Sequence, residues 1–92
     1  MLKNFIEDNK LKQWPSKSSD RQEALAFLAS YIPANKKYSE NEMNNLLNKL
    51  HLFNDSAFLR RELCDRRLIS RDKYGREYWK TNLVRSLSEL NL

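Results

Sequence analysis

The sequence predicts an α+β fold, specifically a winged helix-turn-helix with three core helices, a two-stranded wing and a short C-terminal helix. Three observations lead to this expectation. Apolar residues recur at helical spacing in three segments between residues 19 and 65. The last two of these segments are separated by only a few residues, as in a helix-turn-helix unit. Two extended segments follow, and the only glycine of the chain, Gly75, lies between them.

The chain of 92 residues fits one domain with short flanking segments. We expect an N-terminal arm at residues 1–18, the winged-helix domain at 19–80 and a C-terminal helical tail at 81–92. The arm is expected to be irregular and basic between residues 10 and 17. Trp14 is its expected anchor, because the following proline favours an extended conformation at this position.

The first helix is expected to begin at Ser19 or Asp20 and to end by about Tyr31. Both starts offer a capping box, in which a side chain three residues later returns a hydrogen bond to the cap. The partner is Gln22 for the first start and Glu23 for the second. A proline two residues beyond Tyr31 prevents the helix from continuing.

The second helix has the clearest start signal in the chain. A short extended segment, Lys36–Tyr38, is long enough for a minimal strand and precedes it. Ser39 is the expected cap, and Glu42 completes a capping box. The apolar stripe that follows has the spacing of one buried helix face. It consists of Met43, Leu46, Leu47 and Leu50.

The third helix is expected to run from a cap at Asn54 or Asp55 to about Asp65. Its inner face consists of Phe58, Leu59 and Leu63. This placement turns four side chains outward on the opposite face. They are Ala57, Arg60, Arg61 and Cys64.

A hairpin and a helical tail complete the expected fold. Leu68–Arg71 and Arg76–Trp79 are the two strands, because β-favouring residues surround a polar turn at Asp72–Gly75. The tail carries an apolar stripe, which predicts either a dimer helix or docking on the core of the domain itself. It consists of Leu83, Val84, Leu87 and Leu90.

The positive charge is concentrated on the third helix and the wing. The chain has a net charge of +5, and the segment from Phe58 to Lys80 holds eight basic and four acidic residues. Double-stranded DNA is therefore the expected partner, with the third helix in the major groove and the wing on the backbone. Sequence preference would depend on Arg60 and Arg61. The expected contact residues are Asn54, Ala57, Arg60, Arg61, Arg71, Lys73, Tyr74 and Arg76.

The sequence argues against catalysis and against bound groups. It contains no Ser-His-Asp set, and one glycine cannot build a phosphate-binding loop. His51 has no second ligand at metal-binding spacing, so we expect it to cap the end of the second helix. The single cysteine, Cys64, excludes an internal disulfide and suits a reducing cytoplasm. We therefore predict a cytoplasmic protein that is not an enzyme and has no catalytic residue, metal, cofactor or membrane span.

Several motifs resemble a bacterial domain-of-unknown-function family that occurs alone or at the C-terminus of helix-turn-helix transcription regulators. The similarity covers roughly residues 5 to 80, and its most specific part is Leu59–Leu63 with the later pair Tyr78 and Trp79. The other similar segments are Leu11–Lys17 and Tyr38–Glu42. The resemblance implies a winged-helix fold and a role in transcription regulation, without an established biochemical activity.

A second function remains open on the sequence alone. Winged helices also serve as protein-interaction modules, because a fold does not determine its function. Separately, the basic face could bind nothing and be a solvated surface with local ion pairs such as Arg61 with Asp65. Salt dependence separates the two functions, because DNA affinity falls steeply with salt whereas a hydrophobic complex does not weaken in this way.

Overall fold

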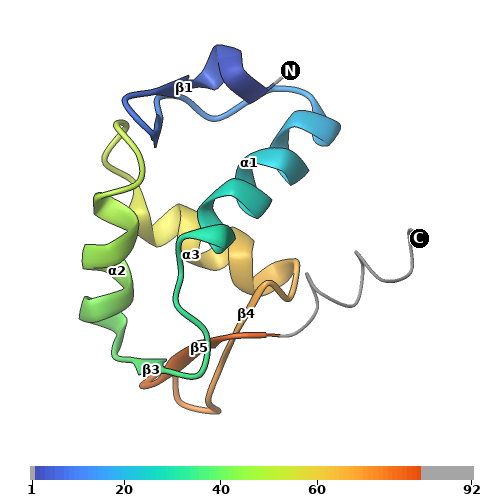
Figure 1. Cartoon of the computed structure of the whole chain (residues 1–92). Helices are drawn as coiled ribbons and strands as arrows, with labels where there is room; N and C mark the ends of the chain where they lie inside the picture. The colour runs from blue at the N-terminus through green and yellow to red at the C-terminus, as the bar shows by residue number, and fades with distance from the viewer. Residues whose placement is uncertain (1, 82–92) are drawn as a thin grey trace.

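The computed structural model describes residues 2–81 and has an α+β architecture (Figure 1). The three predicted helices and the predicted hairpin are present. The predicted C-terminal helix and its apolar stripe lie outside the described residues. The elements in chain order are η1 Leu2–Phe5, β1 Ile6–Glu7, β2 Lys10–Leu11, α1 Ser18–Ser30, β3 Lys37–Tyr38, α2 Glu40–Asn48, α3 Ser56–Asp65, β4 Ile69–Arg71 and β5 Tyr78–Lys80.

The N-terminal arm contains a small β-hairpin rather than only an irregular segment. Asp8 and Asn9 connect β1 to β2 with φ angles of 51° and 62°. Two consecutive residues with positive φ are typical of a tight hairpin turn, and Asp and Asn tolerate this conformation. Leu11 is fully buried, its N–H donates to the Leu50 carbonyl at 2.8 Å, and its carbonyl accepts from Leu52 at 2.9 Å. The arm thus pairs with the turn between α2 and α3.

Trp14 joins the arm to α3, in keeping with its expected role as an anchor. Its ring contacts Phe58 edge-to-face, with 5.1 Å between the ring centroids. On α1, the Arg21 guanidinium lies 5.8 Å from the centroid of the Trp14 ring, and its Nε donates to the Pro15 carbonyl at 2.8 Å. These contacts fix the chain where it enters α1.

The capping boxes predicted for α1 are wrong. The helix begins at Ser18, and its cap is Lys17, whose side chain makes no capping hydrogen bond. Ser19 and Asp20 therefore lie inside the first turn, where neither can act as the cap. The physical reason is that Lys17 is the last extended residue, with φ −87° and ψ 140°.

The capping box predicted for α2 is confirmed. The Ser39 hydroxyl accepts from the Glu42 N–H at 3.1 Å, and the Glu42 carboxylate accepts from the Ser39 N–H at 2.8 Å. These backbone and side-chain hydrogen bonds lower the pKa of Glu42. At α3 the cap is Asp55, which accepts from the Phe58 N–H at 3.3 Å, whereas Asn54 occupies the preceding turn with φ 52°.

His51 holds the turn between α2 and α3. Its Nδ1 lies 2.7 Å from the Leu47 carbonyl oxygen, so it caps the end of α2 as predicted. Its Nε2 accepts from the Asp55 N–H at 2.8 Å, at the start of α3. Because Nε2 accepts, the ring proton must lie on Nδ1, which then donates to Leu47. This neutral tautomer ties the two helices together through one buried side chain.

The predicted hairpin is part of a larger sheet. β5 lies between β3 and β4, and both pairings are antiparallel. Tyr38, Tyr78 and Arg71 share one row of the sheet, while Lys37 pairs with Trp79 in the next row. Figure 1 shows this sheet at the opposite end of the domain from the N-terminal hairpin.

One core joins the helices to the sheet. Leu47, Leu59 and Leu63 are buried as expected, Leu68 is buried with them, and Leu46 packs against them while half-buried. Burial of such side chains supplies most of the favourable free energy of folding. The other large buried side chains include Leu11, Leu25, Leu28, Ile32, Met43, Ile69 and Tyr78.

Arg67, which follows the end of α3, adopts a left-handed backbone conformation that is uncommon for a residue with a side chain. The Arg67 N–H donates to Cys64 at 3.0 Å, and the Leu68 N–H donates to Leu63 at 2.9 Å, which is the pattern of a Schellman motif. Arg67 has φ 62°, in the position that glycine usually fills. The side chain therefore strains the backbone at the helix end.

Replacing Arg67 by glycine is expected to stabilise the domain by about 0.5–1 kcal/mol, because the left-handed conformation then costs no steric strain. Thermal melts would measure this as a higher Tm. Arg66→Gly is the matched control, since Arg66 has φ −94° and gains nothing from glycine. An unchanged or lower Tm for Arg67→Gly would contradict the strain.

Candidate nucleic-acid interface

The exposed face of α3 carries one free arginine. Leu59 and Leu63 point into the core, and Ala57 and Arg61 lie exposed on the other face. Within residues 2–81, Arg61 forms no ion pair, so the pair with Asp65 that a purely solvated basic surface would carry is not formed. Its guanidinium is free to bind an external acceptor.

The expectation that Arg60 also points outward is wrong. Its side chain is only 16% exposed and lies 3.3 Å from the Glu40 carboxylate. It also donates to the Asn44 side chain, and its guanidinium lies 5.6 Å from the centroid of the Tyr78 ring. Because its long stem reaches along the flank of α3, Arg60 connects this helix to both α2 and β5. It fixes the position of α3 instead of facing solvent.

The loop between β4 and β5 is held by Asp72. Its N–H donates to the Glu77 carbonyl at 3.0 Å, which closes the loop. Its carboxylate accepts from the Arg76 N–H at 2.6 Å and from the Glu77 N–H at 3.1 Å. Gly75 supplies the turn with φ 69°, which confirms its expected role. The sequence placed Asp72 at the start of this turn but did not single out its carboxylate as the group that holds the loop.

Two cations surround an exposed ring at the tip of this loop. Tyr74 is 69% exposed, which is more than any other large hydrophobic residue described. The Lys73 ammonium lies 5.7 Å from its centroid and the Arg76 guanidinium lies 5.3 Å from it. Within the described part of the chain, neither cation has an ion-pair partner. The tip therefore presents two positive charges next to an aromatic ring.

Because the ionised carboxylate of Asp72 holds the loop, the stability of the loop conformation depends on pH. Burial acts to raise the pKa of Asp72, but the N–H groups of Glu77 and Arg76 and the Arg76 charge outweigh it, so the pKa lies below its ordinary 3.8. Because this pKa is lowered, the ionised Asp72 carboxylate stabilises the loop above pH 3.8. This stabilisation is lost as the pH falls through the folded-state pKa.

We therefore expect the amide signals of Arg76 and Glu77 to shift in NMR spectra during an acid titration, with a midpoint below 3.8. In the Asp72→Ala variant these two transitions should disappear, because the acceptor is absent. Persistence of both transitions in this variant would contradict the role of Asp72.

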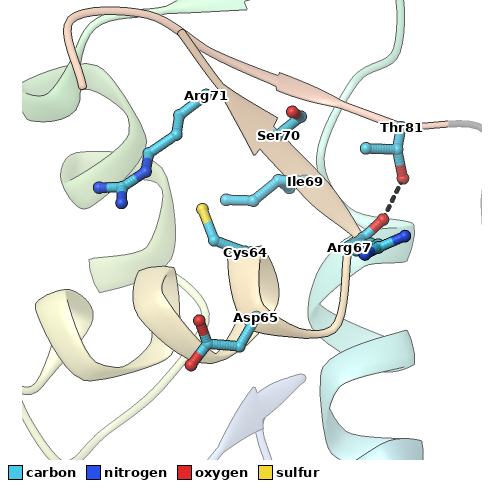
Figure 2. A pocket seen from close by; sticks show the side chains of 7 residues that line it. All are labelled: Cys64, Asp65, Arg67, Ile69, Ser70, Arg71 and Thr81. Carbon is cyan, nitrogen blue, oxygen red and sulfur yellow. Dashed lines mark hydrogen bonds between the residues drawn. The ribbon is translucent and has the colours of Figure 1, made fainter. Parts of the chain in front are cut away.

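Arg71 lines a hollow between the end of α3 and β4 (Figure 2). The hollow has a volume of about 390 Å³ and contains Cys64, whose thiol points toward Ile69 and Arg71. Burial raises the pKa of Cys64, and the nearby Arg71 and Arg60 charges offset this only in part. The thiol is thus protonated at neutral pH, so the hollow offers guanidinium groups and no thiolate. Its lining residues are Cys64, Asp65, Arg67, Ile69, Ser70, Arg71 and Thr81.

The predicted site residues thus divide into two groups. Ala57, Arg61 and Arg71 lie exposed on α3 and β4, and the tip of the loop between β4 and β5 adds its two cations and Tyr74. Arg60 is engaged inside the domain, and Asn54 belongs to the turn before α3. The sequence reasoning did not single out Arg67, which is exposed beside the hollow.

Residues 10–80 match the model of a family described as an uncharacterized protein conserved in bacteria, DUF2087. The chain belongs to the DUF2087 family. This confirms the resemblance seen in the sequence, and the description of DUF2087 assigns no activity. No curated protein and no solved structure matches the chain. Between residues 2 and 81, the helices of this DUF2087 domain lack the length and apolar character needed to cross a membrane.

Proposed function

We propose that this DUF2087 domain is a winged-helix module that binds double-stranded DNA in bacterial transcription regulation. From α1 onward, its element order is helix, strand, helix, helix and a strand pair, and β3 joins the edge of this pair beside β5, as in winged helices. In this proposal α3 enters the major groove. The hairpin of β4, β5 and the loop between them is the wing, and it contacts the phosphate backbone.

The observation that carries the proposal is the placement of unpaired cations. Arg61 on α3 and three residues of the hairpin, Arg71, Lys73 and Arg76, are exposed and form no ion pair within residues 2–81. Basic residues that are not needed for folding are available for phosphates and base edges. A basic surface without a binding role would neutralise more of them in local ion pairs.

The affinity for a duplex of random sequence, measured at two salt concentrations, tests the proposal. Four phosphate contacts give a salt slope of about −3.6, so the affinity should fall roughly 100-fold between about 50 and 200 mM salt. No binding at the lower salt concentration would overturn the proposal and favour a protein partner. Duplex binding that is insensitive to salt would contradict the phosphate contacts that the proposal assigns to these cations.

The two neighbouring arginines of α3 should differ in what they control. Arg61→Ala should weaken duplex binding and, if Arg61 reads a base, relax the preference at that base pair by about 1–3 kcal/mol. Its free energy of unfolding should change by less than about 0.5 kcal/mol, because Arg61 is exposed. Arg60→Ala should lower the free energy of unfolding by about 1–3 kcal/mol, because Glu40, Asn44 and Tyr78 all lose a partner.

Duplex affinity and urea unfolding of both variants check this difference. Each variant is the control for the other, since both remove one positive charge from the same helix. Equal effects on stability would contradict the assignment of Arg60 as a connection inside the domain.

A further inference from the structure

A second basic pocket lies on the sheet, away from the proposed DNA interface. It has a volume of about 300 Å³ and is lined by Asn35, Lys36, Lys37, Trp79 and Lys80. Three of the five residues are cationic, and no acidic side chain of the described chain lines it. Such a concentration of one charge favours an anionic ligand.

The pocket opens on the sheet face that points away from α3. Tyr78 faces the core, where it is 2% exposed and contacts Arg60 of α3. Successive residues of a strand point to opposite faces, so Trp79 lies on the other face of β5. Lys37 is its register partner, and the Lys37 ammonium lies 5.8 Å from the centroid of the Trp79 ring. A duplex bound along α3 would therefore leave this pocket free.

We propose that this pocket binds a nucleotide, with the base stacked on Trp79 and the phosphates bound by the lysines. A tryptophan ring that is accessible on a sheet face can stack on any nucleic-acid base, because every base has a flat aromatic face. Lysine ammonium groups bind phosphate oxygens through charge-assisted hydrogen bonds. The combination of ring and cations fits a ligand that has both a flat aromatic group and a phosphate.

The contact between Lys37 and Trp79 is compatible with this ligand. In the free protein the ammonium covers the ring, which is a cation–π contact of modest strength at an exposed site. A base would replace the ammonium on the ring, and the displaced lysine would then bind the phosphate. Lys36, which directly precedes β3, and Lys80 of β5 also line the pocket.

Tryptophan fluorescence tests the proposal in the full chain. The Trp14→Phe background leaves Trp79 as the only tryptophan, because the chain contains two. ADP should quench the fluorescence with saturation, and adenosine or inorganic pyrophosphate alone should bind about 10-fold more weakly. A single-stranded oligothymidylate distinguishes the source of the nucleotide, since it should compete with ADP only if an unpaired strand also fits.

Matched lysine variants locate the site. Lys37→Ala and Lys80→Ala should each weaken ADP binding about 10-fold, whereas Lys12→Ala, an exposed lysine of the arm, should leave it unchanged. Quenching by neither ADP nor the oligonucleotide would overturn the proposal. Equal binding of ADP and pyrophosphate would also overturn it, because the ring would then contribute nothing. The outcome does not depend on duplex binding, which these ligands do not measure.

Discussion

Replacing Leu63 by alanine is expected to lower the free energy of unfolding by about 2–5 kcal/mol. Leu63 is fully buried on the inner face of α3, in the core that joins this helix to the sheet. A chain of this size has a modest core, and small domains have a total stability of about 5–15 kcal/mol. The substitution should therefore remove a large fraction of the stability.

Urea denaturation followed by circular dichroism measures the loss. Leu52→Ala is the matched control, because Leu52 is 47% exposed and its removal should cost less than about 0.5 kcal/mol. If Leu63→Ala cost no more than this control, the position of α3 in the core would be wrong.

Local signals were sufficient to predict the helices and the hairpin. Ser39 and Glu42 stand three residues apart directly before an apolar stripe, and the structure forms this capping box. The single glycine at residue 75 marked the hairpin turn, because few other residues accept its φ of 69°. In these cases a few neighbouring residues determine the conformation, so the sequence alone is informative.

Contacts between distant segments were not predictable in the same way. Arg60 was expected to face solvent, because helix periodicity describes one helix and not the neighbour that covers its flank. Its partners Glu40 and Asn44 lie on α2, 20 and 16 residues earlier in the chain. The pocket around Trp79 combines β3 and β5 for the same reason, since only the sheet pairing brings Lys37 beside that ring.

Removing the three cations of the wing should have the largest effect on function. Under the proposed function, Arg71, Lys73 and Arg76 each contact a phosphate, and each contact contributes about 0.9 to the salt slope. The triple alanine variant should therefore lose about 2.7 units of slope and, at about 0.1 M salt, on the order of 10²–10³-fold in duplex affinity. Folding should change little, because all three side chains are exposed.

A control variant that loses three positive charges elsewhere on the surface separates the effect of where the charges lie from the effect of net charge. Lys12, Lys17 and Lys49 are exposed and lie outside α3 and the wing, so replacing them by alanine lowers the net charge equally. Phosphate contacts act within about one Debye length, roughly 10 Å at 0.1 M salt, so charge removed elsewhere should weaken binding much less. Duplex affinity against salt for both variants measures the difference. Equal losses would mean that binding follows net charge alone, and the wing would then have no specific part in it.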